Sequence, residues 1–430
     1  MSVEGSQTEA NPEQLEIAIS EHGAPDKEPS EPMTPQEMAL RLVALVVVLY
    51  VFLLGISLMG NSFKLIGGGA VGAVFQAIQH PIAGLMVGMM GTALIQSSST
   101  TTSIIVALVA GGAVDVSNAI PMVMGANIGT SVTNTLVSMG HAGDRDEFKR
   151  AFAGATVHDF FNILAVIVLL PMEIAFGIIE KASAYLTGAL SGVGGGKLGS
   201  PLKVILSPVQ SLIVKVDKAK IKASAAGETI DGSLIKGGLF HGTGLADSVV
   251  GLIILIGAGV LIIGALVVIV KLMKSLMEAK AAQFLKKALE ANAYAAMGIG
   301  MVVTIMVQSS SITTSTLVPL VGIGLISLEA IFPLTLGANI GTTVTALIAS
   351  MASDSSTGLQ IALCHLLFNI LGILIWFPIP FMREVPLSMA RKLGEVVAER
   401  RYMAVVYIAV VFFIIPFGIL ALDRFISGAS

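Results

Sequence analysis

The sequence predicts an all-α polytopic membrane protein with two inverted repeats, each containing a re-entrant helical hairpin. First, 54% of the 430 residues are hydrophobic and only 12% are charged, about half of the roughly 25% usual in soluble domains. Second, apolar runs of about 20 residues, the length that crosses a bilayer as a helix, recur along the chain. Third, the polar motif Gln-Ser-Ser-Ser occurs twice inside such apolar sequence, at residues 96–99 and 308–311.

The composition excludes several classes of protein. A soluble domain is excluded because too few polar side chains remain to cover its surface. The lack of a basic surface excludes a nucleic-acid-binding protein. Cys364 is the single cysteine, which excludes a disulfide framework or a cysteine zinc site. Residues 1–40 carry nine acidic residues and one basic residue among few apolar ones, so we expect a disordered acidic cytoplasmic tail.

The apolar runs predict about seven full spans in the lipid bilayer, with the N-terminus in the cytoplasm. Lys and Arg set this orientation, because they gather in the connections at 145–150, 271–287 and 383–401. The lysine-rich segment 181–247 is assigned to the outside, since long loops translocate largely regardless of charge. The last part, 383–430, then holds a cytoplasmic amphipathic segment and a final span. The predicted spans are 41–60, 117–140, 152–172, 248–271, 326–350, 359–380 and 402–422.

Two further apolar stretches, 81–113 and 293–325, are interrupted midway by Gln-Ser-Ser-Ser and the hydroxyl residues that follow it. Each half has about 15 residues, roughly 22 Å as a helix, and is too short for a hydrocarbon layer of ~30 Å. We therefore predict re-entrant hairpins. Non-helical backbone at that depth must be buried in protein or line a water-filled cavity.

The hairpins belong to an internal repeat. Residues 96–134 align without a gap with residues 308–346, and a second match follows between 158–164 and 365–371. Three full spans, an odd number, separate the hairpins, so the copies are inverted, which is the architecture of secondary transporters. The chain divides accordingly into repeat 1 (41–180, with hairpin 81–113), the outer loop (181–247) and repeat 2 (248–382, with hairpin 293–325).

The interruptions carry chemistry that suits ions. A half-helix that begins near mid-membrane directs unpaired N–H groups and a positive dipole end inward, and Ser and Thr cap such ends. Two opposed N-termini facing one cavity form an anion site, to which Gln96 and Gln308 add amide groups. Neither hairpin contains Lys or Arg, so a divalent anion would need co-bound cations, and hydroxyl and amide oxygens suit Na⁺. These residues predict a cation-coupled anion carrier; the alternative is that small residues only let the helices pack closely.

Both copies also contain Gly-Ala-Asn-Ile-Gly-Thr, at 125–130 and 337–342. Its two glycines should weaken the helix, and we expect its asparagines and threonines to face the hairpin tips. A purely structural helix contact stays open for the asparagines.

A third group, His158, Asp159 and Asn162, lies inside one predicted span, where an acidic residue indicates a functional site. The second copy has Leu366 in place of Asp159, so this carboxylate belongs to one repeat only. The alternative is that Asp159 merely pairs with His158 or Asn162.

The motifs QSSSTTTS, QSSSITTS, GANIGTSVTN, GDRDEFKRAFAGATVHDFFN and LTLGANIGTT together resemble the type II sodium-dependent phosphate cotransporters, over about residues 40–425. The resemblance implies import of inorganic phosphate, as HPO₄²⁻, with Na⁺ as coupling ion, no other cofactor and no enzymatic activity. The implied phosphate ligands are Ser97, Ser98, Ser99, Thr130, Ser309, Ser310, Ser311 and Thr342. The predicted sodium ligands are Gln96, Asn127, Asp159, Gln308, Ser309, Ser310, Asn339, Thr342 and Thr345, with a further site at Asp144 and Asn162.

The sequence also departs from the family pattern. His141 and Ala338 stand where animal members have Gln and Ser, which puts the site at Asp144 and Asn162 in doubt. The electrogenic members carry an Asp where this chain has Asp159. The outer loop lacks the cysteines and the length of animal members, and a final span is absent, so the seven predicted spans leave the C-terminus outside. The resemblance is interpreted as that of a bacterial member in the plasma (inner) membrane. Two alternatives stay open, a sodium-coupled carrier for another oxyanion or a carboxylate, and a passive anion channel.

Overall fold

The computed structural model describes residues 34–66, 80–193, 201–217, 219–221, 232–289, 292–352 and 355–428. In this part of the chain the regular structure is helical, apart from a small antiparallel pair of strands, β1 (Lys215–Val216) and β2 (Ile235–Gly237). Large apolar side chains such as Val46, Val260 and Phe425 are exposed on the outer faces of helices, as expected of surfaces that face lipid. The chain is therefore an all-α polytopic membrane protein. Among the described residues, six helices are long and apolar enough to cross a membrane: Pro35–Ile66, Arg145–Phe176, Asp247–Met273, Leu328–Ser350, Ser356–Trp376 and Tyr402–Ile426.

The elements follow one another in the order that the repeats predict. Repeat 1 contains α2 (Pro35–Ile66), α4 (Pro81–Ile95), α5 (Ser98–Gly111), α6 (Val116–Gly129), α7 (Ser131–Ser138), η1 (Met139–His141) and α8 (Arg145–Phe176). Then come α9 (Ile178–Val193), α10 (Pro201–Ile213) and the two strands. Repeat 2 contains α12 (Asp247–Leu289), α13 (Ala293–Val307), α14 (Ser310–Ser315), α15 (Leu317–Gly322), α16 (Leu328–Ser350) and α17 (Ser356–Trp376). The chain ends with α18 (Pro380–Glu399), α19 (Tyr402–Ala409), the π-helical η2 (Val410–Ile414) and α20 (Ile415–Gly428).

The predicted interruptions of both hairpins are confirmed. Helix α4 ends at Ile95 and α13 ends at Val307, and each is followed by a glutamine in the left-handed region, with φ of 59° at Gln96 and 57° at Gln308. The second half of hairpin 2 is itself divided at Thr316 into α14 and α15.

The predicted span 117–140 is wrong as a single helix. It consists of α6 and α7, which meet at Thr130, whose N–H bonds to the carbonyl of Asn127 in a tightened turn. The equivalent α16 is continuous through the same motif, so the glycines do not by themselves break the helix. They allow close packing instead, because a Cβ at Gly125 would lie 1.9 Å from the carbonyl oxygen of Leu85, and a Cβ at Gly337 1.9 Å from that of Met297.

Two predicted boundaries change. Helix α2 begins at Pro35, within the predicted acidic tail, and residues 1–33 of that tail lie outside the described residues. The predicted outer loop, 181–247, contains most of α9 together with α10 and the strand pair.

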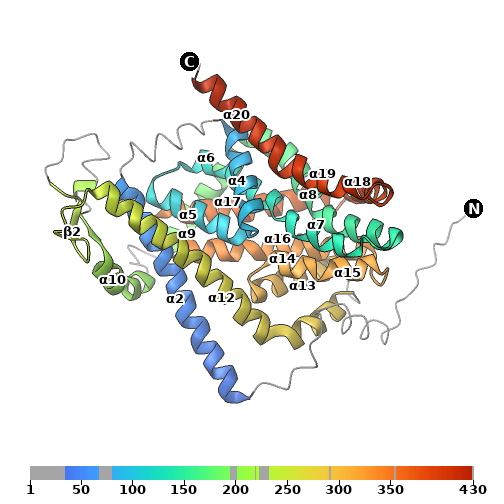
Figure 1. Ribbon diagram of the computed structural model, residues 1–430, viewed down its shortest axis with the longest axis horizontal. Coiled ribbons are helices and arrows are strands. Elements are labelled where there is room, and N and C mark those ends of the chain that lie inside the picture. The colour runs from blue at the N-terminus through green and yellow to red at the C-terminus, as the bar shows by residue number, and fades with distance from the viewer. Residues whose placement is uncertain are drawn as a thin grey trace, which may run out of the picture.

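The first helices of the two repeats, α2 and α12, lie against each other and run in opposite directions (Figure 1). Gly55 of α2 faces Ile262, whereas Ile66, further along α2, faces Gly251, so the partner number falls as the chain advances. Equivalent helices with opposite directions are what an inverted repeat produces.

The two repeats also cross each other. The second half of hairpin 1, α5, packs against α16 and α17 of repeat 2, while α14 and α15 of hairpin 2 pack against α7 and α8 of repeat 1. Phe161 of α8 meets Phe332 of α16 edge to face, with ring centroids 6.1 Å apart. The core is therefore built from both repeats together.

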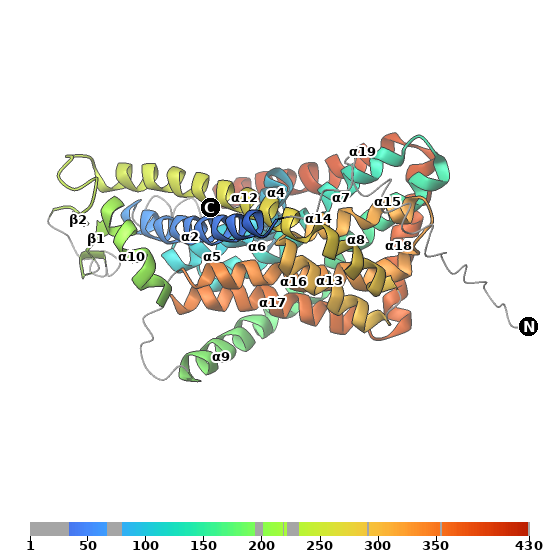
Figure 2. The same cartoon turned by 90° about the horizontal axis from the view of Figure 1, so that it is seen from below.

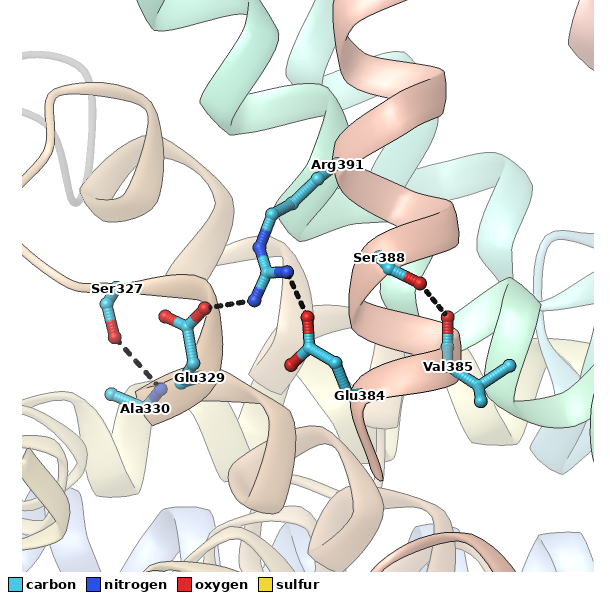
Figure 3. A network of polar contacts seen from close by, with 7 residues as sticks. All are labelled: Ser327, Glu329, Ala330, Glu384, Val385, Ser388 and Arg391. Atoms are coloured by element: carbon cyan, nitrogen blue, oxygen red, sulfur yellow. Dashed lines mark hydrogen bonds and ion pairs between the residues drawn. The ribbon is translucent and has the colours of Figure 1, made fainter. Parts of the chain in front are cut away.

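Different helices and strands lie at the two ends of the molecule (Figure 2). The strands and α10 lie at one end, and α15 and α18 at the other. At the second end Arg391 of α18 pairs with Glu384 of the same helix and with Glu329 in the first turn of α16 (Figure 3). Lys149 of α8 pairs with Glu395 at 2.8 Å, so α18 is attached to both repeats.

Candidate functional site

The two glutamines hold the helix interruptions in the same way. The hydroxyl of Thr133 donates to Oε1 of Gln96 at 2.8 Å, and the hydroxyl of Thr345 donates to Oε1 of Gln308 at 3.0 Å. Each glutamine also donates from Nε2 to a carbonyl in the helix it terminates, Ala93 or Ile305. A left-handed backbone is unfavourable for a residue other than glycine, so these side-chain bonds help to stabilise the interruption.

The first serine of each motif is a helix cap. Ser97 is extended, and its hydroxyl oxygen accepts from the N–H of Thr100 at 3.2 Å and from the Thr100 hydroxyl at 2.9 Å. Ser309 accepts from the N–H of Ile312 at 3.3 Å. Both were predicted as phosphate ligands, and Ser309 also as a sodium ligand; the structure gives their side chains a capping role at the start of α5 and α14.

The next two serines of each motif are different. In the described part of the chain, the hydroxyls of Ser98, Ser99, Ser310 and Ser311 make no hydrogen bond. Deeper hydroxyls are engaged within the helix, since Thr102 donates to the carbonyl of Ser98 at 2.8 Å and Ser103 to that of Ser99 at 2.7 Å. Ser98 and Ser310 are each only 4% exposed. Ser99 is 5% exposed and Ser311 is partly exposed, so two pairs of hydroxyl donors are available at the start of the two half-helices.

Thr130 and Thr342 occupy equivalent positions with similar bonds. Thr130 donates its hydroxyl proton to the carbonyl of Ala126 at 3.2 Å, and Thr342 donates to that of Ala338 at 3.0 Å. A phosphate oxygen needs a donor, whereas Na⁺ needs an oxygen lone pair. With the proton engaged, both threonines suit sodium better than phosphate.

Each asparagine of the repeated motif pairs with a histidine of the opposite repeat. Oδ1 of Asn339 lies 2.5 Å from Nε2 of His158, and Oδ1 of Asn127 lies 3.2 Å from Nε2 of His365. Nδ2 of Asn339 also donates to Oδ1 of Asn162 at 3.2 Å. The structural helix contact, left open from the sequence, is what the structure contains.

Asp159 is fully buried on α8, but it does not pair with His158 or Asn162. His158 contacts Ser131 at 2.9 Å, and Asn162 donates to the carbonyl of His158 at 3.0 Å. The partner of Asp159 is Tyr407 of α19, whose hydroxyl donates to Oδ2 at 2.8 Å.

The structure does not bring Asp144 and Asn162 together. Eighteen positions separate them on the continuous helix α8, about 27 Å at the helical rise of ~1.5 Å per residue. Asp144 is exposed and caps α8, where the N–H groups of Glu147 and Asp146, each at 2.9 Å, lower the pKa of its carboxyl. The predicted sodium site that combines Asp144 and Asn162 is therefore wrong for this structure.

Two residues of the site region were missed. Thr133 could have been found, because it is the repeat equivalent of Thr345, which was predicted. Asn134, which accepts from the hydroxyl of Thr314 at 3.0 Å, has alanine at the equivalent position, so the repeat gave no signal for it.

The family model described as Na⁺/Pi-cotransporter matches residues 51–194 and 250–400, which include both hairpins. The chain belongs to the Na⁺/Pi-cotransporter family. No solved structure gives a significant match.

The relatives in this family are similar over most of the chain. Sodium-dependent phosphate transport protein 2A of Rattus norvegicus is 38% identical, covering 94% of this chain and 75% of the relative. The 2A protein of Ovis aries is 41% identical, covering 86% of this chain and 65% of the relative. Protein 2B of Homo sapiens is 38% identical, covering 89% and 65%. These relatives are mammalian, and the bacterial origin of the chain stays a prediction.

Proposed function

We propose that the protein is a sodium-coupled symporter that imports inorganic phosphate by alternating access. Membership of the Na⁺/Pi-cotransporter family and the names of the relatives support the substrate and the coupling ion. The observation that carries the proposal is the pair of equivalent helix interruptions, each with two serine hydroxyls that have no hydrogen-bond partner among the described residues.

Phosphate is held by these four hydroxyls and by the positive end of α5. The N–H groups of Ser98 and Ser99 belong to the first turn of that helix, where backbone donors lack a partner within the helix. Ser310 and Ser311 supply the matching hydroxyls from hairpin 2. Hydroxyl and amide donors are selective for an oxyanion but bring no positive charge of their own.

Sodium supplies the missing charge. Neither hairpin contains Lys or Arg, and a divalent anion in a medium of low dielectric constant needs compensation. The lone pairs of Thr130, Thr342 and Thr345 are suitable ligands, together with the carbonyl groups of Gln96 and Gln308. Asp159 provides the one carboxylate for a sodium ion in repeat 1. Binding of phosphate and sodium is therefore mutually favourable, and each ligand raises the affinity of the other by the same factor.

The first test is transport by the purified protein in proteoliposomes. We expect uptake of labelled phosphate that depends on an inward sodium gradient and that excess sulfate does not inhibit. Inhibition by sulfate would favour a carrier for other oxyanions, and uptake indifferent to the sodium gradient would favour a passive channel. Replacing Na⁺ by choline should weaken phosphate binding measured by calorimetry.

The second test addresses the hairpin site. Ser98→Ala and Ser310→Ala each remove one donor, and the loss of a buried hydrogen bond of about 1–3 kcal/mol corresponds to roughly 5- to 150-fold in phosphate affinity. Ser103→Ala is the matched control, because Ser103 lies on the same α5 and its hydroxyl is engaged with the carbonyl of Ser99. Near-normal phosphate affinity in both site variants would overturn the hairpin model.

A further inference from the structure

The surroundings of Asp159 are incomplete in one specific direction. This side chain is 0% exposed, and its Oδ2 accepts from the hydroxyl of Tyr407 at 2.8 Å. Its other oxygen, Oδ1, is buried and has no hydrogen-bond partner within the described chain. A buried carboxylate oxygen without a hydrogen-bond partner is unfavourable, so a cation bound at Oδ1 would stabilise it; the hydroxyl of Ser131, which contacts His158 at 2.9 Å, is the other polar neighbour of this carboxyl.

Two aromatic rings, one on α8 and one on η2, hold the ring of Tyr407 in place. Its ring meets Phe152 of α8 edge to face at 6.0 Å and Phe412 of η2 at 5.9 Å. Both phenylalanines are fully buried. Phe152 and Asp159 are seven positions apart on α8, about two turns, so they share one face of that helix. The ring that packs on Phe152 thus directs its hydroxyl along α8 to Asp159.

The π-helical turn in the last span explains how Phe412 reaches Tyr407. In an α-helix, a residue five positions ahead is rotated by roughly 140°, away from the first residue. In the π-helical η2 (Val410–Ile414) the repeat is i to i+5, which brings Phe412 towards the side of Tyr407. Such turns are rare and occur frequently at functional sites.

We propose that Tyr407 is a positioning residue for a sodium ion bound at Asp159, so that the last membrane helix takes part in charge coupling. The tyrosine hydroxyl fixes Oδ2 and leaves Oδ1 directed at the cation. The inference rests on the proposed sodium-coupled transport and adds to it a residue from outside the two repeats. Repeat 2 has no counterpart, because Leu366 stands at the position equivalent to Asp159.

The test uses Tyr407→Phe in the full chain, which keeps the ring between Phe152 and Phe412 and removes only the hydroxyl. We expect the sodium concentration for half-maximal phosphate uptake to rise about tenfold, the order expected from one lost hydrogen bond to a charged group. The KM for phosphate at saturating sodium should stay unchanged. Tyr402→Phe is the matched control, since Tyr402 lies on the same α19, is 60% exposed, and should leave both parameters unchanged.

A double-substitution cycle separates this role from a general effect on packing. If Tyr407 acts through Asp159, Tyr407→Phe should have no further effect on sodium dependence in a protein that already carries Asp159→Asn. An equal effect of Tyr407→Phe in both backgrounds would overturn the proposal. Sodium-dependent thermal stabilisation in detergent measures the same binding without transport, so a slow variant still gives a decisive result.

The results that would refute the role of Tyr407 differ from those that would refute the proposed function. If the wild-type protein shows sodium-driven phosphate uptake and Tyr407→Phe behaves like Tyr402→Phe, only the role of Tyr407 is wrong. If wild-type uptake ignores sodium, the proposed function itself is wrong.

Discussion

The crossed pairs of histidine and asparagine make an unequal prediction about stability. Asn339 and Asn127 occupy equivalent positions in the two repeats, and both are nearly fully buried, at 2% and 3% exposed. Leucine has almost the same shape as asparagine and cannot form hydrogen bonds. We expect Asn339→Leu to destabilise the protein about twice as much as Asn127→Leu.

The magnitude follows from the groups that each substitution leaves without a partner. Asn339→Leu deprives Oδ1 of Asn162 and also Nε2 of His158, whose other neighbour, Nδ2 of Asn162 at 3.1 Å, is itself a donor and cannot replace the lost amide oxygen. Asn127→Leu deprives one such group, Nε2 of His365. A buried polar group without a partner costs about 1–3 kcal/mol. The expected loss of stability is therefore about 2–6 kcal/mol at Asn339 and about 1–3 kcal/mol at Asn127.

The assay is thermal unfolding of the purified variants in one detergent, at equal protein concentration and scan rate. Membrane proteins of this size commonly unfold irreversibly, so the ranking of apparent melting temperatures is compared at a fixed rate. A melting temperature of Asn127→Leu that is as low as that of Asn339→Leu, or lower, would refute the reasoning.

Three other side chains give predictions about charge, attachment and capping. Asp159→Gly should remove one charge from each transport cycle, because the sodium ion that the carboxylate requires is no longer bound. Each charge that crosses the membrane responds to voltage by ~2.3 kcal/mol per 100 mV. Charge movement and labelled phosphate uptake in the same vesicles give the charge moved per phosphate, and an unchanged value would contradict the prediction. Arg391→Gln should lower the free energy of unfolding by less than about 1 kcal/mol, because the side chains of Arg391 and Glu329 are 38% and 53% exposed. Lys392→Gln is the control, and a larger decrease measured by denaturant unfolding would count against the prediction. The pKa of Asp144 is lowered in the folded state, so its stabilising contribution is complete above the unfolded pKa and is lost as the pH falls through the folded pKa. Asp144→Asn, which caps without a charge, should remove this part of the profile of melting temperature between about pH 5 and about pH 2. A profile identical to wild type would exclude Asp144 as its source.

The helix interruptions could be predicted because their cause is local. A run of Gln, Ser and Thr inside apolar sequence is tolerated in a membrane only where the backbone changes direction against protein or water. The predicted positions agree with the structure closely, since α4 ends at Ile95 and α5 begins at Ser98. Because the motif is repeated, it predicts the same interruption at Gln308 and Ser310.

The roles of individual hydroxyls could not be predicted. Four adjacent residues, Ser97 to Thr100, are chemically alike in the sequence, but one is a cap, two have free hydroxyls and one donates to the cap. That division depends on the φ and ψ angles at Ser97, which no composition or periodicity reports.

Partners that are far apart in the sequence could not be predicted either. Asn127 and His365 are 238 positions apart, and Asp159 and Tyr407 are 248 positions apart. Helical periodicity relates residues that are three, four or seven positions apart and carries no information about such pairs. For the same reason, the glycines of the repeated motif were interpreted as weak points of a helix, when their neighbours across the interface show that they allow close packing.

The crossed pairs also bear on which parts of the molecule would move in the proposed alternating access. Rocking repeat 1 against repeat 2 would break the bonds of His158 to Asn339 and of His365 to Asn127 at the same time, and both bonds are buried. Movement of the joined core, α5 to α8 with α16 and α17, past α2 and α12 would leave them intact. At that second boundary α2 meets α5 through apolar packing, with Gly111 facing the ring of Phe63, and packed helices of this kind can slide by small shear displacements. The boundary with the lower energetic cost therefore runs between the α2–α12 pair and a core that contains parts of both repeats.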